Sequence, residues 1–101
     1  MSRYDHIIRM ESILDTHQSL LDWLDPLLEA FEKHQEEYRQ LTAYYDSPQF
    51  LADYEASNSS SFPKEIKCGV LSEDAVFNLL GDNRRIAERM LEIGTKILKE
   101  E

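Results

Sequence analysis

The sequence contains few of the residues that make turns, strands and cross-links. Its 101 residues include three Gly, three Pro, one Cys and two Val, whereas Leu occurs 13 times. Few Gly and Pro residues predict few turns, and much Leu with little Val favours helices over strands. The lone Cys68 cannot form an internal disulfide, which is typical of a reducing compartment and predicts a cytoplasmic protein.

Long apolar runs and basic clusters are also missing. No stretch approaches the roughly 20 apolar residues of a membrane helix, and charges interrupt the N-terminus, so neither a membrane span nor a secretory signal is expected. Acidic residues outnumber basic ones by 20 to 11, which gives a net charge of −9. This balance argues against nucleic acid as a ligand, because phosphate binding needs clustered Lys and Arg.

The negative charge is concentrated in the first half of the chain. Residues 1–46 hold 10 acidic and 4 basic side chains, residues 47–74 hold 5 and 2, and residues 75–101 hold 5 and 5. Because complementary charge steers association, this distribution predicts a protein partner with a basic surface.

A heptad pattern runs through residues 4–45 and predicts one long amphipathic helix. Apolar residues recur at three positions of each heptad, among them Ile7, Met10, Ile13, Leu14, Leu20, Leu21, Leu24, Leu27 and Leu28. Three positions make a stripe wider than the seam of a two-stranded coiled coil, so the helix is expected to pack against two neighbours.

Pro26 lies inside this pattern and leaves two alternatives. It could kink one helix, since the heptad phase continues from Leu24 to Leu28, or Asp25 and Pro26 could cap and start a second helix. An unbroken helix over 4–45 would be about 63 Å long. That length exceeds a compact domain of this size and would require a partner subunit.

The middle of the chain predicts a short helix and a connector. Ser47 and Pro48 are typical of an N-cap and first helical residue, so residues 49–56 should form a helix that buries its apolar residues. These are Phe50, Leu51 and Tyr54. The polar residues 57–61 predict a flexible loop, and residues 62–71 an irregular connector held to the core by its apolar ends.

A final helix is predicted over residues 73–99, with Ser72 as its cap and acidic residues in its first turn. Its apolar residues follow the same wide heptad stripe, among them Val76, Leu79, Leu80, Ile86, Met90, Ile93 and Ile97. Gly81 weakens its middle, so a break near this residue is an alternative.

Catalytic, cofactor and metal sites are not expected. The histidines do not share a helix face, no acidic residue stands three positions before a His, and one Cys cannot build a zinc site. Cys68 follows Lys67 and precedes a helix, a setting in which a thiol can be reactive, but no base is placed beside it. The chain is therefore predicted not to be an enzyme.

Aromatic residues gather where the predicted helices meet. Tyr38, Tyr44, Tyr45, Phe50 and Tyr54 fall within 17 residues, and Tyr offers apolar area with a polar tip. The four tyrosines, with Lys64 and Lys67 of the connector, form a candidate interaction surface. The alternative is that these rings fill a hydrophobic corner between helices.

Three stretches carry a resemblance to a known family. They are residues 41–47, residues 53–56 and, most distinctively, residues 63–74, which read PKEIKCGVLSED. The chain resembles a family of small bacterial proteins known only as a domain of unknown function, with a Pro-Lys-x-x-Lys-x-Gly-Val-Leu-Ser-Glu-Asp signature. The resemblance implies a small helical bacterial protein and transfers no activity.

Together these observations predict one all-α domain over residues 1–101. A long kinked N-terminal helix and a long C-terminal helix should form an antiparallel hairpin with a short connecting helix, and two copies should form a dimeric bundle. The expected function is a non-catalytic interaction or regulatory role. The alternatives are a small-ligand or enzymatic site in the aromatic corner, an acidic mimic of nucleic acid, and a purely structural assembly subunit.

Overall fold

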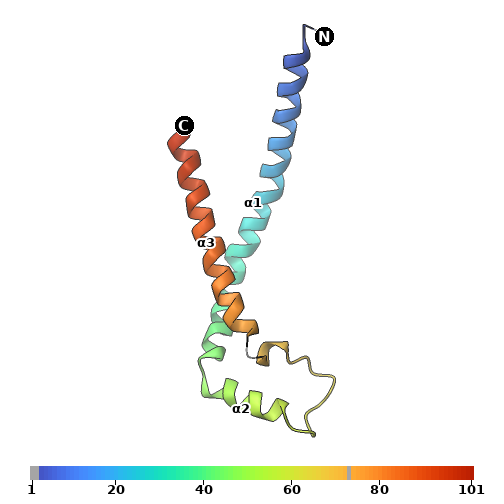
Figure 1. Cartoon of the computed structure of the whole chain (residues 1–101), viewed down its shortest axis with the longest axis vertical. Coiled ribbons are helices and arrows are strands. Elements are labelled where there is room, and N and C mark those ends of the chain that lie inside the picture. The colour runs from blue at the N-terminus through green and yellow to red at the C-terminus, as the bar shows by residue number, and fades with distance from the viewer. Residues whose placement is uncertain (1–2, 73) are drawn as a thin grey trace. The chain divides into compact units, whose positions relative to one another are not determined.

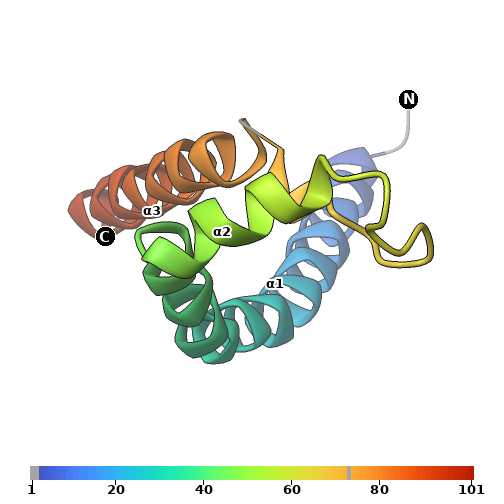
Figure 2. The same ribbon diagram turned by 90° about the horizontal axis from the view of Figure 1, so that it is seen from below.

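The computed structural model describes residues 3–72 and 74–101. These residues form the α-helices α1 (Asp5–Tyr45), α2 (Pro48–Ser57) and α3 (Ala75–Glu100), and a 3₁₀ turn, η1 (Gly69–Leu71) (Figures 1 and 2). No strand occurs in the described residues. The all-α class is therefore confirmed, with a long helix at each end of the chain and a short helix between them.

α1 continues through Pro26 without interruption. A proline in a helix removes one backbone hydrogen bond, here the one to the Asp22 carbonyl, and crowds that carbonyl. The turns on both sides keep their own bonds, and the apolar heptad holds its phase across Pro26. The alternative of a second helix starting at Asp25 and Pro26 is wrong, whereas the kink stays a prediction.

Local side-chain pairs support the polar surface of α1. Gln18 donates a hydrogen bond to Asp22 at 2.9 Å, and Lys33 pairs with Glu29 at 3.3 Å. Both pairs have the i, i+4 spacing that adds a few tenths of a kcal/mol each to a helix. They stabilise the helix as an element, but they bury no apolar side chain.

A tight turn connects α1 to α2, as the sequence predicts. Ser47 takes the N-cap position with extended backbone, and Pro48 is the first helical residue. The Ser47 hydroxyl donates to the Tyr44 carbonyl at 2.6 Å rather than capping α2. The hydroxyl thus satisfies one of the carbonyl groups that the end of α1 leaves without a helical partner.

The connector after α2 is a series of turns that ends in η1. Ser57 is still part of α2, and backbone hydrogen bonds from Ser59 to Ala56 and from Phe62 to Ser59 shape residues 58–61 into turns and a bend. η1 contacts both α2 and α3, and α2 runs crosswise to α3 (Figure 1). Leu71 of η1 is 7% exposed and Val76 of α3 is 2% exposed, so these two residues form the buried apolar core at this point.

α3 begins two residues later than predicted. Asp74 takes the N-cap position, and the Ser72 hydroxyl accepts a hydrogen bond from the Ala75 amide at 3.2 Å. Glu73, which was expected in the first turn, lies outside the described residues. The helix continues through Gly81 to Glu100, so the alternative of a break there is wrong.

The chain divides into two compact units, Met1–Gln40 and Leu41–Glu101. The first unit is the greater part of α1. The second contains the last turn of α1, α2, η1 and α3. The assignment of residues 1–101 to a single domain stays a prediction.

Candidate functional site

The aromatic corner forms where α1 ends and α2 begins. The Phe50 ring lies edge-on to the rings of Tyr44 and Tyr45, with centroid distances of 5.6 and 5.0 Å and interplanar angles of 75° and 73°. Edge-to-face pairs of this kind are favourable beyond the area that they bury. Tyr44 and Tyr45 therefore both pack on Phe50.

A polar network holds the same corner on its outer side. The Tyr44 hydroxyl donates to Asp53 Oδ2 at 2.6 Å, and Gln49 Nε2 donates to Asp53 Oδ1 at 2.7 Å. The hydrogen bonds from Tyr44 and Gln49 hold the pKa of the Asp53 carboxyl below its ordinary value. The hydrogen bond to Asp53, with some burial and the nearby negative charge, raises the pKa of Tyr44 above its ordinary value.

The other predicted surface residues do not join this network. Tyr38 and Tyr54 are half-buried, whereas Lys64 and Lys67 are exposed on the connector. The corner thus brings together two of the six predicted residues, Tyr44 and Tyr45. The prediction that all six form one interaction surface stays untested by these contacts.

Sequence reasoning included Phe50 in the aromatic cluster, but it misplaced Leu51 and missed Asp53. Phe50 was expected in a core together with Leu51, but Leu51 is 59% exposed. Adjacent residues point about 100° apart on a helix, so they cannot both face the same side. Asp53 was also missed, although Gln49 and Asp53 have the i, i+4 spacing of a hydrogen-bonded helix pair.

A long apolar surface lies on α1, and we call it the α1 stripe. It consists of nine large side chains that are 40–60% exposed: Ile7, Met10, Ile13, Leu14, Leu20, Leu21, Leu24, Leu27 and Leu28. No described residue of α1 is buried. One helix cannot cover its own stripe, so this surface requires other helices.

A shallow hollow lies on this stripe beside Pro26. It measures about 470 Å³ and is lined by Leu21, Asp22, Leu24, Asp25, Pro26 and Leu28. Leu21, Leu24, Asp25 and Leu28 have the spacing i, i+3, i+4, i+7. Four residues so spaced form the hole that receives one side chain of a facing helix in knobs-into-holes packing.

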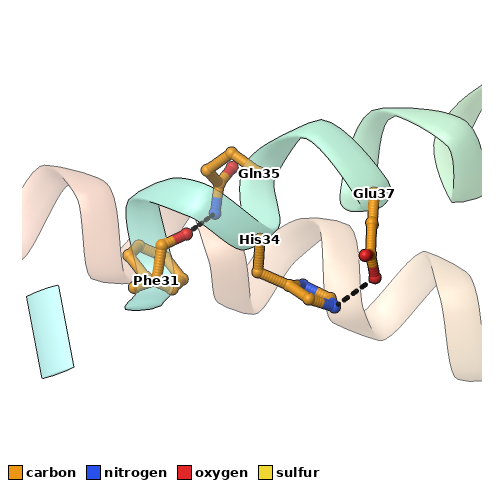
Figure 3. Close-up of polar contacts among 4 residues, drawn as sticks. All are labelled: Phe31, His34, Gln35 and Glu37. Atoms are coloured by element: carbon orange, nitrogen blue, oxygen red, sulfur yellow. Dashed lines mark hydrogen bonds and ion pairs between the residues drawn. The ribbon is translucent and has the colours of Figure 1, made fainter. Parts of the chain in front are cut away.

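Polar side chains of α1 interact along their own helix. His34 Nε2 lies 3.3 Å from Glu37 Oε2, and Gln35 Nε2 donates to the Phe31 carbonyl at 3.5 Å (Figure 3). The His34 and Glu37 side chains are both more than two-thirds exposed. Such exposed pairs contribute little to stability and make no catalytic arrangement.

The described residues contain no group of three or more His, Cys, Asp or Glu side chains that could hold a metal ion. Cys68 is exposed. None of the described helices combines the length and the apolar composition that spanning a membrane requires. The predicted absence of a metal, a cofactor and catalysis stays a prediction.

Comparison with known families gives one result. Residues 7–93 match the family described as Domain of unknown function (DUF4298). The chain belongs to this family. No curated protein matches the chain. The matched residues extend from the α1 stripe through the aromatic corner and most of α3.

Proposed function

We propose that this DUF4298 protein is a non-catalytic interaction or regulatory protein of the bacterial cytoplasm. The observation that carries the proposal is the exposure of the α1 stripe. Full burial of one Leu or Ile contributes about 1.5–3 kcal/mol, and nine such large apolar side chains on α1 are about half exposed. Apolar surface of this extent, bordered by charged residues, is typical of a protein contact site.

The pKa directions of Tyr44 and Asp53 support a structural role for these two groups in the aromatic corner. A general acid or base works best when its pKa lies near the working pH. Here the shared hydrogen bond lowers the pKa of Asp53 and raises that of Tyr44, so both move away from neutrality. The carboxylate stays charged and the phenol stays protonated, which favours structure over proton transfer.

The bacterial and cytoplasmic parts of the proposal rest on the sequence. Residues 63–74 follow the signature quoted above, and the single Cys68 fits a reducing compartment.

The polar face of α1 is proposed to contact a partner with a basic surface. Asp15, Asp22, Glu29 and Glu36 follow one another at seven-residue intervals on the side opposite the α1 stripe. A row of carboxylates steers a basic protein toward the helix and makes the association sensitive to salt.

A pull-down from a bacterium that carries the protein, at low salt, tests this role. The test variant changes Asp15→Asn, Asp22→Asn and Glu36→Gln, and the control carries the same charge change elsewhere, as Glu55→Gln, Glu65→Gln and Glu100→Gln. We expect the wild type and the control to capture the same basic protein, and the test variant to lose it. Equal capture by all three would contradict the proposal.

The mimic of nucleic acid is a narrower version of this role. In that case the captured protein would be one that binds DNA or RNA, and added duplex would displace it at the same salt concentration. Capture that ignores ionic strength would exclude this version.

A further inference from the structure

The α1 stripe is wider than one neighbouring helix can cover. It occupies three positions of each heptad, and α3 carries apolar or small residues at three positions as well. Stripes of this width face two neighbours. The described residues hold only two long helices, α1 and α3, so each long helix finds at most one long neighbour within its own chain. The other neighbour must come from another molecule.

The charges beside the two stripes are complementary. Residues 11–32 of α1 hold six acidic side chains and no Lys or Arg, whereas residues 84–99 of α3 hold five basic side chains and two acidic ones. Glu11, Asp25 and Glu32 occupy the heptad position that borders the α1 stripe, and Arg89 and Lys96 occupy a bordering position on α3. Two α1 helices side by side would instead place 12 carboxylates near one another.

The hollow beside Pro26 fits the same arrangement. Its rim combines Leu21, Leu24 and Leu28 with the carboxylate of Asp25. An aliphatic side chain of α3 that enters the hole would bring the basic residues beside it close to Asp25. The partially exposed aliphatic residues of α3 are Leu79, Ile86, Ile93 and Ile97, which are 37–50% exposed.

We propose that the chain forms a homodimer in which α1 of each copy packs along α3 of the other copy. The two contacts are equivalent, so the assembly closes with twofold symmetry and presents no further stripe for growth. The inference rests on the proposed interaction role, but it concerns the α1 stripe and not the acidic face. Its test therefore uses purified protein alone.

Light scattering of the purified chain measures the oligomeric state directly. A chain of 11.9 kDa should give a mass of about twice that value at micromolar concentration. A mass of 11.9 kDa at high micromolar concentration would overturn the proposal.

Two charge-reversal variants identify which helices meet. One reverses α1 with Glu11→Lys, Asp25→Lys and Glu32→Lys, and the other reverses α3 with Arg89→Glu, Lys96→Glu and Lys99→Glu. Each variant alone should dimerise at least about tenfold more weakly than the wild type, because like charges then face each other. An equimolar mixture should form a heterodimer, since both of its contacts are again complementary.

Other pairings give other results. If α1 packs on α1 of the second copy, the α3 reversal alone would dimerise like the wild type. If α3 packs on α3 of the second copy, the variant with α1 reversed would dimerise like the wild type. Either result overturns the proposal. Should a reversal fail to fold, the milder variant Glu11→Gln, Asp25→Asn and Glu32→Gln decides. Removing these charges should weaken an α1–α3 contact, whereas it would strengthen an α1–α1 contact and leave an α3–α3 contact unchanged. A dimer as strong as the wild type or stronger would overturn the proposal.

Discussion

The two compact units differ in where their order comes from. In Leu41–Glu101, two buried side chains, edge-to-face aromatic pairs and a hydrogen-bonded corner join several short segments. In Met1–Gln40 there is a single helix with a half-exposed apolar stripe and no buried residue among those described. Most helical stability in proteins comes from packing of an apolar face. The comparison teaches that the second unit is organised by its own contacts, whereas the first leaves its apolar stripe available for the proposed contact with a second copy.

The largest expected effect is on the α1 stripe. Replacing Leu24→Asp and Leu28→Asp should convert the proposed dimer to a monomer and lower the helix content of residues 5–40, because charged groups cannot be buried there without partners. Circular dichroism and light scattering measure both changes. Ile8→Asp is the matched control, since Ile8 is 65% exposed and lies on the opposite side of α1. If Ile8→Asp lowers the mass and the helix content as much as the double variant does, these properties do not depend on the α1 stripe.

Pro26→Ala should increase the stability of the helix in Met1–Gln40. It restores the hydrogen bond to the Asp22 carbonyl and replaces the poorest helix former by the best, a difference of about 3 kcal/mol in a helix interior. Thermal unfolding followed by circular dichroism should show a higher midpoint. An unchanged or lower midpoint would mean that the proline shapes the hole at Leu24 and Leu28 in a way that α1 packing requires.

Leu71→Ala tests the unit that holds its own core. Leu71 is one of the two buried apolar residues in the described part of the chain, and its truncation should lower the free energy of unfolding by about 2 kcal/mol. Urea denaturation measures this value. Val70→Ala, at a more exposed neighbouring position, should cost clearly less. Equal losses would show that η1 is not anchored through Leu71.

The smallest effect is the pH dependence of the aromatic corner. The folded-state pKa of Asp53 is lowered, so its contribution is present above the unfolded value and is lost as the pH falls through the folded one. The pKa of Tyr44 is raised, so its contribution is present below the unfolded value and is lost as the pH rises through the folded one.

The Tyr44–Asp53 contact should therefore be complete between about pH 4 and pH 10. NMR titration of the Asp53 carboxyl should give a lowered pKa in the wild type and a value nearer the ordinary one in Tyr44→Phe. Tyr54→Phe is the control and should leave the Asp53 titration unchanged. An equal Asp53 pKa in the wild type and in Tyr44→Phe would contradict the hydrogen bond between Tyr44 and Asp53.

Much of the fold was accessible from the sequence because its signals are local. The heptad phase across Pro26 indicated that α1 is one helix, and the pair Ser47 and Pro48 located the start of α2. The predicted start of α3 was less accurate, because Ser72 and Asp74 are both good N-cap residues and only the backbone geometry shows which of them takes that position.

The candidate site was less accessible because it depends on contacts between elements. Aromatic composition pointed to Tyr44, Tyr45 and Phe50, but nothing in the sequence showed that Phe50 faces the two tyrosine rings while Leu51 lies exposed. The acceptor Asp53 comes from the next helix, so only the turn at Ser47 brings it to Tyr44.

The spacing of the α1 stripe also fixes a handedness. Its apolar residues repeat every seven positions from Ile7 to Leu28, which is three heptads, while a straight α-helix drifts by about 20° per heptad against such a repeat. Over three heptads this drift amounts to roughly 60°, so a straight neighbouring helix would no longer contact the stripe at its far end. Any helix that follows α1 over this length must therefore wind around it in a left-handed supercoil.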